Sequence, residues 1–146
     1  MKNKQLLSLA TVGPLGYFPA SGTFGSLVGL VLVGITHYFL DMTTQACVIG
    51  LFLLAGFFII KSTLRYFSSC DPREIIIDEV IGCTVAFYGL SLSIYSIVLC
   101  FLIFRFFDIT KVGGIWYIEK VCKGSWGILL DDIAAALVTN MLMRAL

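Results

Sequence analysis

Uncharged, mostly apolar runs alternate with short polar segments along this chain of 146 residues. A membrane-spanning helix needs ~20 predominantly apolar residues, and ~17 can suffice. The runs have about this length, and they lack the alternation of apolar and polar residues that is typical of a transmembrane β-barrel. The pattern therefore predicts an all-α membrane protein with apolar segments at 24–40, 42–60, 80–104 and 128–146.

The longest of these runs is interrupted by Gly89-Leu-Ser-Leu-Ser93, which is typical of a turn between two segments. The connection at 105–127 is expected to contain a short helix lying on the membrane surface, because it carries apolar residues that could dip inward. We therefore predict a compact polytopic helix bundle that includes this interfacial helix. It has about five membrane helices, near 24–40, 43–61, 75–89, 93–108 and 128–146.

Composition excludes several classes of protein. Hydrophobic residues make up 59% of the chain and charged residues 13%, and the mean hydropathy is +0.98. A soluble domain is ~45–50% apolar and ~25% charged, so a soluble or disordered chain is excluded. The net charge of +1, without a basic stripe, excludes a nucleic-acid partner. The five cysteines are an odd number without a Cys-x-x-Cys motif, which indicates packed, reduced thiols.

The distribution of basic residues predicts how the chain is oriented. Lys and Arg concentrate in the segments 1–22, 61–74 and 105–123, whereas the loops near 41–43 and 90–93 carry none. The positive-inside rule places the basic segments on the cytoplasmic side of the membrane. We found no internal repeat or linker, so residues 1–146 are predicted to form a single domain whose N-terminal segment, 1–22, is cytoplasmic.

Four polar segments then fall on the same side of the membrane, at the ends of predicted helices. They are 21–26, 71–79, 105–111 and 123–132. Hydropathy does not require the acidic pairs and the basic residues to share a side. We therefore expect the four segments to converge on one site at the inner membrane surface.

Two acidic pairs lie within apolar surroundings, Asp78-Glu79 and Asp131-Asp132. Carboxylates inside apolar helices are costly, and they usually face a bundle interior or water. Adjacent helical residues point ~100° apart, so each pair can supply one inward ligand and one supporting group. Oxygen ligands from different helices suit Mg²⁺ or Mn²⁺. The alternative is that these are interfacial carboxylates, solvated or paired with Arg and Lys.

The residues Arg105, Asp108 and Lys111 share part of one helix face because they are spaced three apart. Arg can bind a phosphate through two parallel hydrogen bonds, and Lys can bind it as a point charge. Asp108 could be a metal ligand, a base or a nucleophile, or it could orient Arg105. The alternative is that these charges mark the end of a membrane helix and reach toward water.

The segment 21–26 reads Ser-Gly-Thr-Phe-Gly-Ser and opens the first membrane helix. Free backbone N–H groups at a helix start favour anions, and hydroxyl groups add donors. This makes Gly22, Thr23 and Ser26 candidates for phosphate binding. The alternative is an ordinary helix cap, for which small residues are common.

These segments together resemble the phosphatidylglycerophosphatase A family. The resemblance rests on Asp71-Pro-Arg-Glu-Ile-Ile-Ile-Asp-Glu-Val-Ile-Gly82, Phe104-Arg-Phe-Phe-Asp-Ile-Thr-Lys111 and Lys123-Gly-Ser-Trp-Gly-Ile-Leu-Leu-Asp-Asp-Ile-Ala-Ala-Ala136. The segment 21–26 is similar to the family's Pro-Gly-Thr-x-Gly-Ser opening, with Ser21 in place of the proline. Order and spacing agree over roughly residues 15–140.

The resemblance implies a Mg²⁺-dependent lipid phosphatase of the bacterial inner membrane. The implied reaction converts phosphatidylglycerophosphate into phosphatidylglycerol and inorganic phosphate, on the cytoplasmic side of the membrane. Its implied partners are this phospholipid and the surrounding membrane lipids, and no protein partner is inferable. The implied catalytic residues are Asp78, Glu79, Asp108, Asp131 and Asp132, of which all but Asp108 are expected to hold metal. The implied phosphate-binding residues are Gly22, Thr23, Ser26, Arg105 and Lys111.

Two other functions remain open from the residues alone. A cation transporter or channel could use the same carboxylates, and it would place them near the middle of the membrane, reachable from both sides. A non-catalytic membrane subunit would tolerate replacement of the carboxylates without loss of function.

Overall fold

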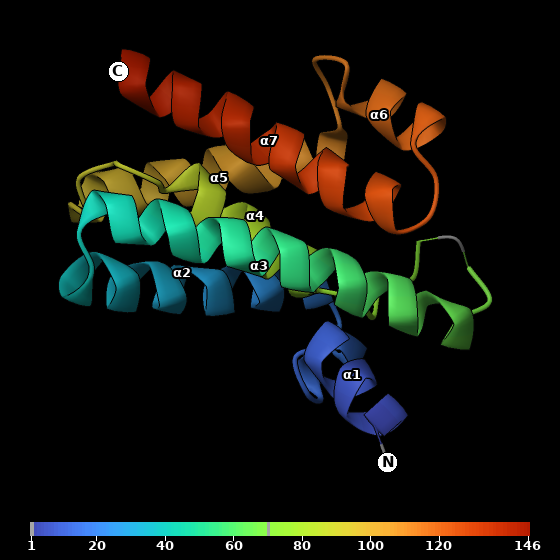
Figure 1. Cartoon of the computed structure of the whole chain (residues 1–146). Helices are drawn as coiled ribbons and strands as arrows, with labels where there is room; N and C mark the ends of the chain where they lie inside the picture. The colour runs from blue at the N-terminus through green and yellow to red at the C-terminus, as the bar shows by residue number, and fades with distance from the viewer. Residues whose placement is uncertain (1, 70) are drawn as a thin grey trace.

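The computed structural model describes residues 2–69 and 71–146, and over these ranges the chain is helical without a β-strand (Figure 1). The all-α prediction is confirmed. There are seven α-helices in the described part: α1 (Lys2–Ala10), α2 (Ser21–Phe39), α3 (Met42–Thr63), α4 (Ile77–Ala86), α5 (Ile94–Thr110), α6 (Ile115–Val121) and α7 (Ser125–Ala145). Two short 3₁₀ turns, η1 (Leu15–Tyr17) and η2 (Leu64–Tyr66), complete the helical elements.

The expectation of five spanning helices is too high for the described residues. Three helical stretches are long and apolar enough to cross a membrane, namely Ser21–Phe39, Met42–Tyr66 and Ser125–Ala145. The helix expected at 75–89 is the ten-residue α4, whose length of about 15 Å is half of the ~30 Å hydrocarbon layer. The α5 helix has 17 residues. The predicted short helix in the 105–127 connection is present as α6.

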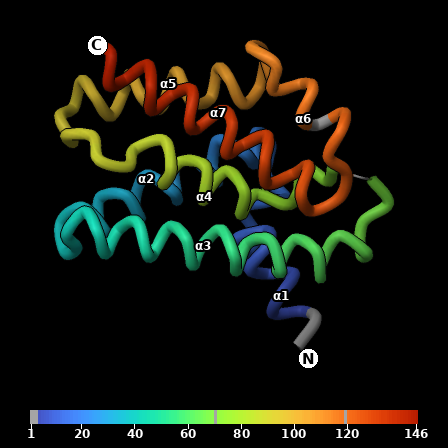
Figure 2. Tube along the Cα trace, turned by 45° about the horizontal axis from the view of Figure 1, so that its top comes forward, coloured from blue at the N-terminus to red at the C-terminus, as the bar shows by residue number. Residues whose placement is uncertain are grey.

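The α4 helix forms the centre of the bundle. It packs against α2, α3, α5 and α7, and Figure 2 shows it between α3 and α7. Most of its side chains are buried, including Val80, Ile81 and Cys83. An all-round buried helix of this kind gives the apolar run that hydropathy detects, although it does not need to cross a membrane.

The contact between α2 and α4 is close because small residues of α2 lie against the α4 backbone. A Cβ atom built on Gly25 would lie 2.8 Å from the carbonyl oxygen of Ile76, and one built on Gly29 would lie 2.7 Å from that of Val80. Small residues at such positions let two helices approach backbone to backbone. The α2 helix thereby brings its first turn beside the first turn of α4.

The far end of α4 is closed by polar side chains of α7. Asn140 donates hydrogen bonds from Nδ2 to the carbonyl oxygens of Ala86 and Tyr88, at 2.8 and 2.9 Å. Arg144 adds a bond from Nη2 to the Tyr88 oxygen at 2.9 Å. Carbonyl groups at a helix end lack partners within the helix, and in an apolar setting they must be satisfied by other groups. These side chains explain how α4 can end inside the bundle.

The described cysteines agree with the prediction of free thiols. Cys83 and Cys100 are buried, Cys47 is exposed and Cys122 is half-buried, and none of these four forms a disulfide. Cys70 lies outside the described residues.

Candidate active site

A polar cavity of about 410 Å³ lies at the end of the bundle where α2, α4 and α7 begin and α5 ends. Figure 1 shows these helix ends on one side of the molecule, toward α6. The lining includes six acidic and three basic side chains. It consists of Ala20, Ser21, Gly22, Asp71, Pro72, Arg73, Ile75, Asp78, Glu79, Arg105, Asp108, Ile109, Lys111, Asp131 and Asp132.

The four polar segments that the sequence predicted to converge all reach this cavity, and eight of the ten predicted site residues line it. The cavity includes all five predicted acids, together with Gly22, Arg105 and Lys111. The other two, Thr23 and Ser26, lie in the first turns of α2 and are not part of the lining.

The start of α4 is fixed by hydrogen bonds from two distant parts of the chain. The N–H of Ile76 donates to the carbonyl oxygen of Ala10 at 3.0 Å, and Ser21 Oγ donates to that of Arg73 at 2.6 Å. The segment before α4 is therefore held against the end of α1 and the start of α2. This positions Asp78 and Glu79, in the first turn of α4, at the cavity.

Three carboxylates from two helices come together in the cavity wall. One oxygen each from Asp78, Glu79 and Asp132 lies within 4.8 Å of the others. Asp78 Oδ1, Glu79 Oε2 and Asp132 Oδ2 are buried, and none of them has a hydrogen-bond partner among the described residues. Buried carboxylate oxygens without partners are costly unless a cation or a donor satisfies them.

The donor set of this trio fits a divalent cation. Three carboxylate oxygens are hard ligands of the kind that Mg²⁺ and Mn²⁺ prefer. The other two predicted acids, Asp108 and Asp131, line the same cavity but are ion-paired with Arg105 and Lys111. Asp78, Glu79 and Asp132 are thus the residues that could hold the metal, and the orphaned oxygen atoms are the structural reason.

Arg105 is held between α5 and the start of α2. Its Nη1 forms an ion pair with Asp108 one turn further along α5, and the same nitrogen donates to Ser26 Oγ at 3.4 Å. A Cβ atom on Gly22 would overlap Glu79 Oε1 and lie 3.0 Å from Arg105 Nη2, so the glycine makes room for both side chains. Arg105 Nε is buried without a partner among the described residues, which leaves donor capacity for a ligand.

Ser26, which the sequence predicted to bind phosphate, lies outside the cavity lining. It is fully buried, and its Oγ donates to the carbonyl oxygen of Gly22 at 2.9 Å while it accepts from Arg105. The hydroxyl thus supports the guanidinium group rather than lining the cavity. In the first turn of α2, the N–H of Thr23 already donates to the carbonyl oxygen of Ala20 at 2.9 Å. The helix start reaches the cavity through Ser21 and Gly22.

Lys111 reaches the cavity from the end of α5. Its backbone is left-handed, with φ of 51°, and its N–H donates to the carbonyl oxygen of Phe107 at 2.8 Å, which closes the helix. The Lys111 Nζ forms an ion pair with Asp131 Oδ2 at 2.6 Å. Asp131 is buried, with 6% of its side chain exposed. The pair joins α5 to α7 across the cavity.

Two charged residues of the cavity were not among the candidates from the sequence. Asp71 and Arg73 lie in the segment before α4 and line the cavity. They belong to the polar segment 71–79, but no apolar surroundings marked them as unusual. The sequence did offer one signal for them, namely Pro72 between the two residues. Proline restricts the backbone and favours a turn, which would hold the neighbouring charged side chains in place.

Comparison with known proteins shows which family this chain resembles. The sequence model of the Phosphatidylglycerophosphatase A family matches residues 8–146. A phosphatidylglycerophosphatase A of Haemophilus influenzae is 32% identical over 129 residues, which cover 88% of this chain and 79% of the relative. The Escherichia coli protein of the same name is 28% identical, covering 81% of this chain and 69% of the relative.

A third relative has a different name. A Bacteroides thetaiotaomicron protein, provisionally named as a phosphatidylinositol-3-phosphatase, is 27% identical over 139 residues, covering 88% of this chain and 84% of the relative. No solved structure matches the chain.

Proposed function

Because the chain belongs to the phosphatidylglycerophosphatase A family, and is thereby a phosphoric monoester hydrolase, we propose that its substrate is phosphatidylglycerophosphate. Water attacks the phosphorus of the terminal monoester, and the bond from phosphorus to the glycerol oxygen breaks. The glycerol oxygen takes up a proton. The products are phosphatidylglycerol and inorganic phosphate.

One observation carries this proposal beyond the family name. Asp78, Glu79 and Asp132, each with one buried carboxylate oxygen that lacks a hydrogen-bond partner among the described residues, share a cavity with the cationic side chains of Arg105 and Lys111. Six acids outnumber the three basic side chains of the lining, so a bound cation would reduce the repulsion of a phosphate group. An arrangement of acids and bases around one cavity is suited to metal-assisted phosphate chemistry.

In this proposal Asp78, Glu79 and Asp132 hold Mg²⁺. The bound ion supplies neutralisation of the phosphoryl charge and lowers the pKa of a bound water. Arg105 donates hydrogen bonds to phosphoryl oxygens from the nitrogen atoms that Asp108 and Ser26 leave available.

Lys111, at the end of α5, contributes a second positive charge, and its ion pair with Asp131 of α7 fixes its position. Ser21 and Gly22, which begin α2 and line the cavity, donate backbone N–H groups to the same phosphate in this proposal. Together these groups orient the phosphate and stabilise the charge that develops on it in the transition state.

The proposed location is the inner membrane of a bacterium, with several membrane passes and the cavity facing the cytoplasm. The apolar helices and the bacterial sources of the relatives support it. The basic segments 61–74 and 105–123 flank the cavity end of the bundle, in agreement with the positive-inside rule.

The alternative of a cation transporter is less well supported. It requires carboxylates near the middle of the membrane with access from both sides. Here Asp78 and Glu79 lie in the first turn of α4, and Asp131 and Asp132 lie in the second turn of α7. The acids therefore gather at one end of the bundle.

The substrate is tested by comparing two lipid phosphomonoesters. Purified protein in mixed micelles is assayed for phosphate release from phosphatidylglycerophosphate and from phosphatidylinositol 3-phosphate. We expect kcat/KM to be at least about tenfold higher for phosphatidylglycerophosphate, a difference that one or two hydrogen bonds can supply. A preference for the inositol lipid would make the substrate assignment wrong, and release from neither lipid would overturn the proposed function.

A further inference from the structure

The cavity has two rims of different chemistry. Asp71, Pro72 and Arg73 form a polar rim in the segment before α4. A second rim is formed by Ala20, just before α2, and by Ile109, in the last turn of α5. Ile109 lines the polar cavity and is nevertheless 68% exposed. It is the point where the charged site meets the apolar outer face of the bundle.

The second rim lies where the start of α2 and the last turn of α5 reach the same cavity. The two helices approach each other at Arg105, which contacts Ser26 and lies close to Gly22. Beyond this point α2 runs back to Ser21 and α5 continues through Ile109 to Thr110. Ala20 and Ile109, at these two ends, both line the cavity, and we call the edge of the cavity between them the lateral opening.

Exposed apolar side chains lie close in the chain to both residues of this edge. On α5, Phe106 is 55% exposed, one turn before Ile109. Two residues before Ala20, the exposed ring of Phe18 packs against that of Phe24, with 5.8 Å between the ring centroids. Exposed apolar side chains on a membrane bundle face the hydrocarbon layer. The lateral opening thus joins the polar cavity to exposed apolar side chains.

A lipid phosphomonoester needs such a path. Its phosphate must reach Arg105 and the carboxylates, but moving its acyl chains into water costs free energy with every methylene group. An opening in the side of the bundle satisfies both requirements at once. An opening toward water alone would require the whole lipid to leave the bilayer.

Resting on the lipid phosphatase activity proposed above, we propose that the diacylglycerol part of the substrate lies in this lateral opening. Ile109 and Phe106 form one wall, and Phe18 and Ala20 form the other. The headgroup passes between the walls into the cavity, while the acyl chains stay in the membrane.

Photo-crosslinking tests this placement without depending on turnover. The cross-linking residue p-benzoylphenylalanine is incorporated in place of Ile109 in the Asp78→Asn variant, so that the substrate is not consumed. The matched control carries it in place of Leu102, an exposed residue two turns earlier on α5. Both proteins are irradiated in phosphatidylcholine vesicles that contain a minor fraction of phosphatidylglycerophosphate, and the adducts are identified by mass spectrometry.

At position 109 we expect phosphatidylglycerophosphate to be at least about fivefold enriched among the adducts over its mole fraction, because bound substrate dwells there. At position 102 the adducts should follow the vesicle composition. Equal enrichment at both positions, or none at 109, would overturn the lateral opening. Incorporation in place of Phe106 repeats the measurement if the first variant does not fold.

A kinetic comparison separates this inference from the proposed function. Ile109→Trp fills the opening, and we expect it to raise KM for the micellar lipid by about tenfold. Leu102→Trp should leave KM unchanged. If wild-type protein releases no phosphate from any lipid, the proposed function fails; if wild type is active and Ile109→Trp matches it, only the lateral opening fails.

Discussion

Asp131 and Asp132 are neighbours in α7 whose carboxylates serve different partners. Asp132 lies with Asp78 and Glu79 of α4 in the group of three carboxylates that could hold a metal ion, whereas Asp131 forms an ion pair with Lys111 of α5. The sequence showed that both pairs of acids were unusual, because they interrupt apolar runs. It could not show which member of each pair turns toward which helix, since that depends on how α4, α5 and α7 pack. In α4 both acids join the trio, and in α7 only one does.

This difference predicts unequal effects of two conservative substitutions. Asp132→Asn removes a ligand charge, so we expect Mn²⁺, used as a probe for Mg²⁺, to bind at least about tenfold more weakly. Asp131→Asn should change Mn²⁺ affinity by less than about threefold, but it should raise KM for the lipid by about tenfold because Lys111 loses its anchor. Electron paramagnetic resonance titration of Mn²⁺ and steady-state kinetics measure the two quantities. Equal loss of Mn²⁺ affinity in both variants would make this division of roles wrong.

At the scale of the helices, α4 carries two of the site carboxylates, and its bounds show what could be predicted from the sequence. Hydropathy predicted a helix over 75–89, and the structure has one over Ile77–Ala86. The boundary differs because Asn140 and Arg144 bind the carbonyl oxygens near its end, and no local pattern reveals such long-range bonds. The turn after α4 was visible in the sequence, and Gly89 adopts φ of 69° there.

The close contact between α2 and α4 predicts a contrast between two glycines of α2. In Gly29→Ala the new Cβ would lie 2.7 Å from both the Val80 carbonyl oxygen and Cys83 Cβ. The α4 backbone would have to move to relieve this overlap, so we expect the free energy of unfolding to fall by about 1–3 kcal/mol.

Gly34→Ala is the matched control, since a Cβ there meets nothing within 4 Å. It should stay within about 1 kcal/mol of wild type, because only helix propensity changes. Unfolding in a detergent titration, followed by circular dichroism, measures both variants. Similar stability for the two would contradict the close packing of α2 on α4.

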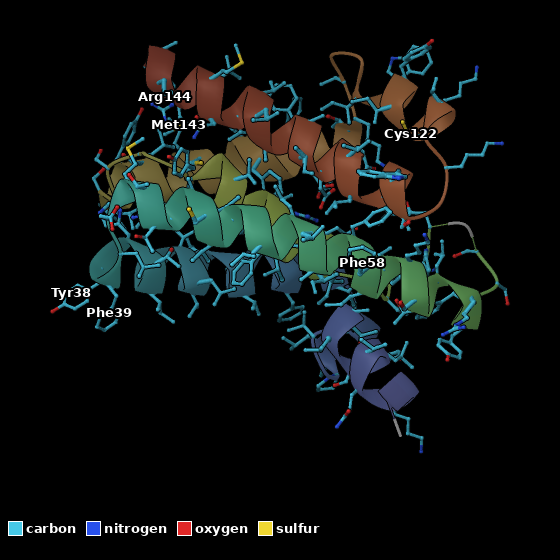
Figure 3. The ribbon with its side chains drawn as sticks, in the orientation of Figure 1. Tyr38, Phe39, Phe58, Cys122, Met143 and Arg144 are labelled. Carbon is cyan, nitrogen blue, oxygen red and sulfur yellow. The ribbon has the colours of Figure 1, made fainter. Side chains whose placement is uncertain are left out.

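At the scale of the whole molecule, the two ends of the bundle differ in charge and chemistry. Cys122, after α6, lies at the end that carries the cavity, and Tyr38, Phe39 and Arg144 lie at the other (Figure 3). The sequence predicted this separation, because the positions of Lys and Arg and the alternation of apolar runs with polar segments can both be read directly along the chain. The number of spanning helices was predicted less well, because hydropathy cannot distinguish a buried helix from a spanning one.

The proposed orientation predicts opposite labelling of the two ends. The other four cysteines are replaced by alanine, and a membrane-impermeant maleimide is applied to intact cells and to permeabilised cells. Cys122 should react only after permeabilisation. A Tyr38→Cys residue, in a second protein that also carries Cys122→Ala, should react in intact cells, because Tyr38 is exposed at the opposite end. Reaction of Cys122 in intact cells would place the cavity outside the cytoplasm.

The most direct test of the account is the metal dependence of phosphate release from phosphatidylglycerophosphate by the purified protein. Wild type and Asp78→Asn are compared in Mg²⁺ and in EDTA. The control is Asp41→Asn, which changes an exposed acid at the start of α3, far from the cavity lining.

We predict that EDTA abolishes release by wild type and that added Mg²⁺ restores it. Asp78→Asn should be at least about 100-fold slower in Mg²⁺, since a metal ion supplies several kcal/mol of transition-state stabilisation. Asp41→Asn should match wild type. Undiminished release in EDTA, or full activity of Asp78→Asn, would contradict the central claim that the buried carboxylates hold a catalytic cation.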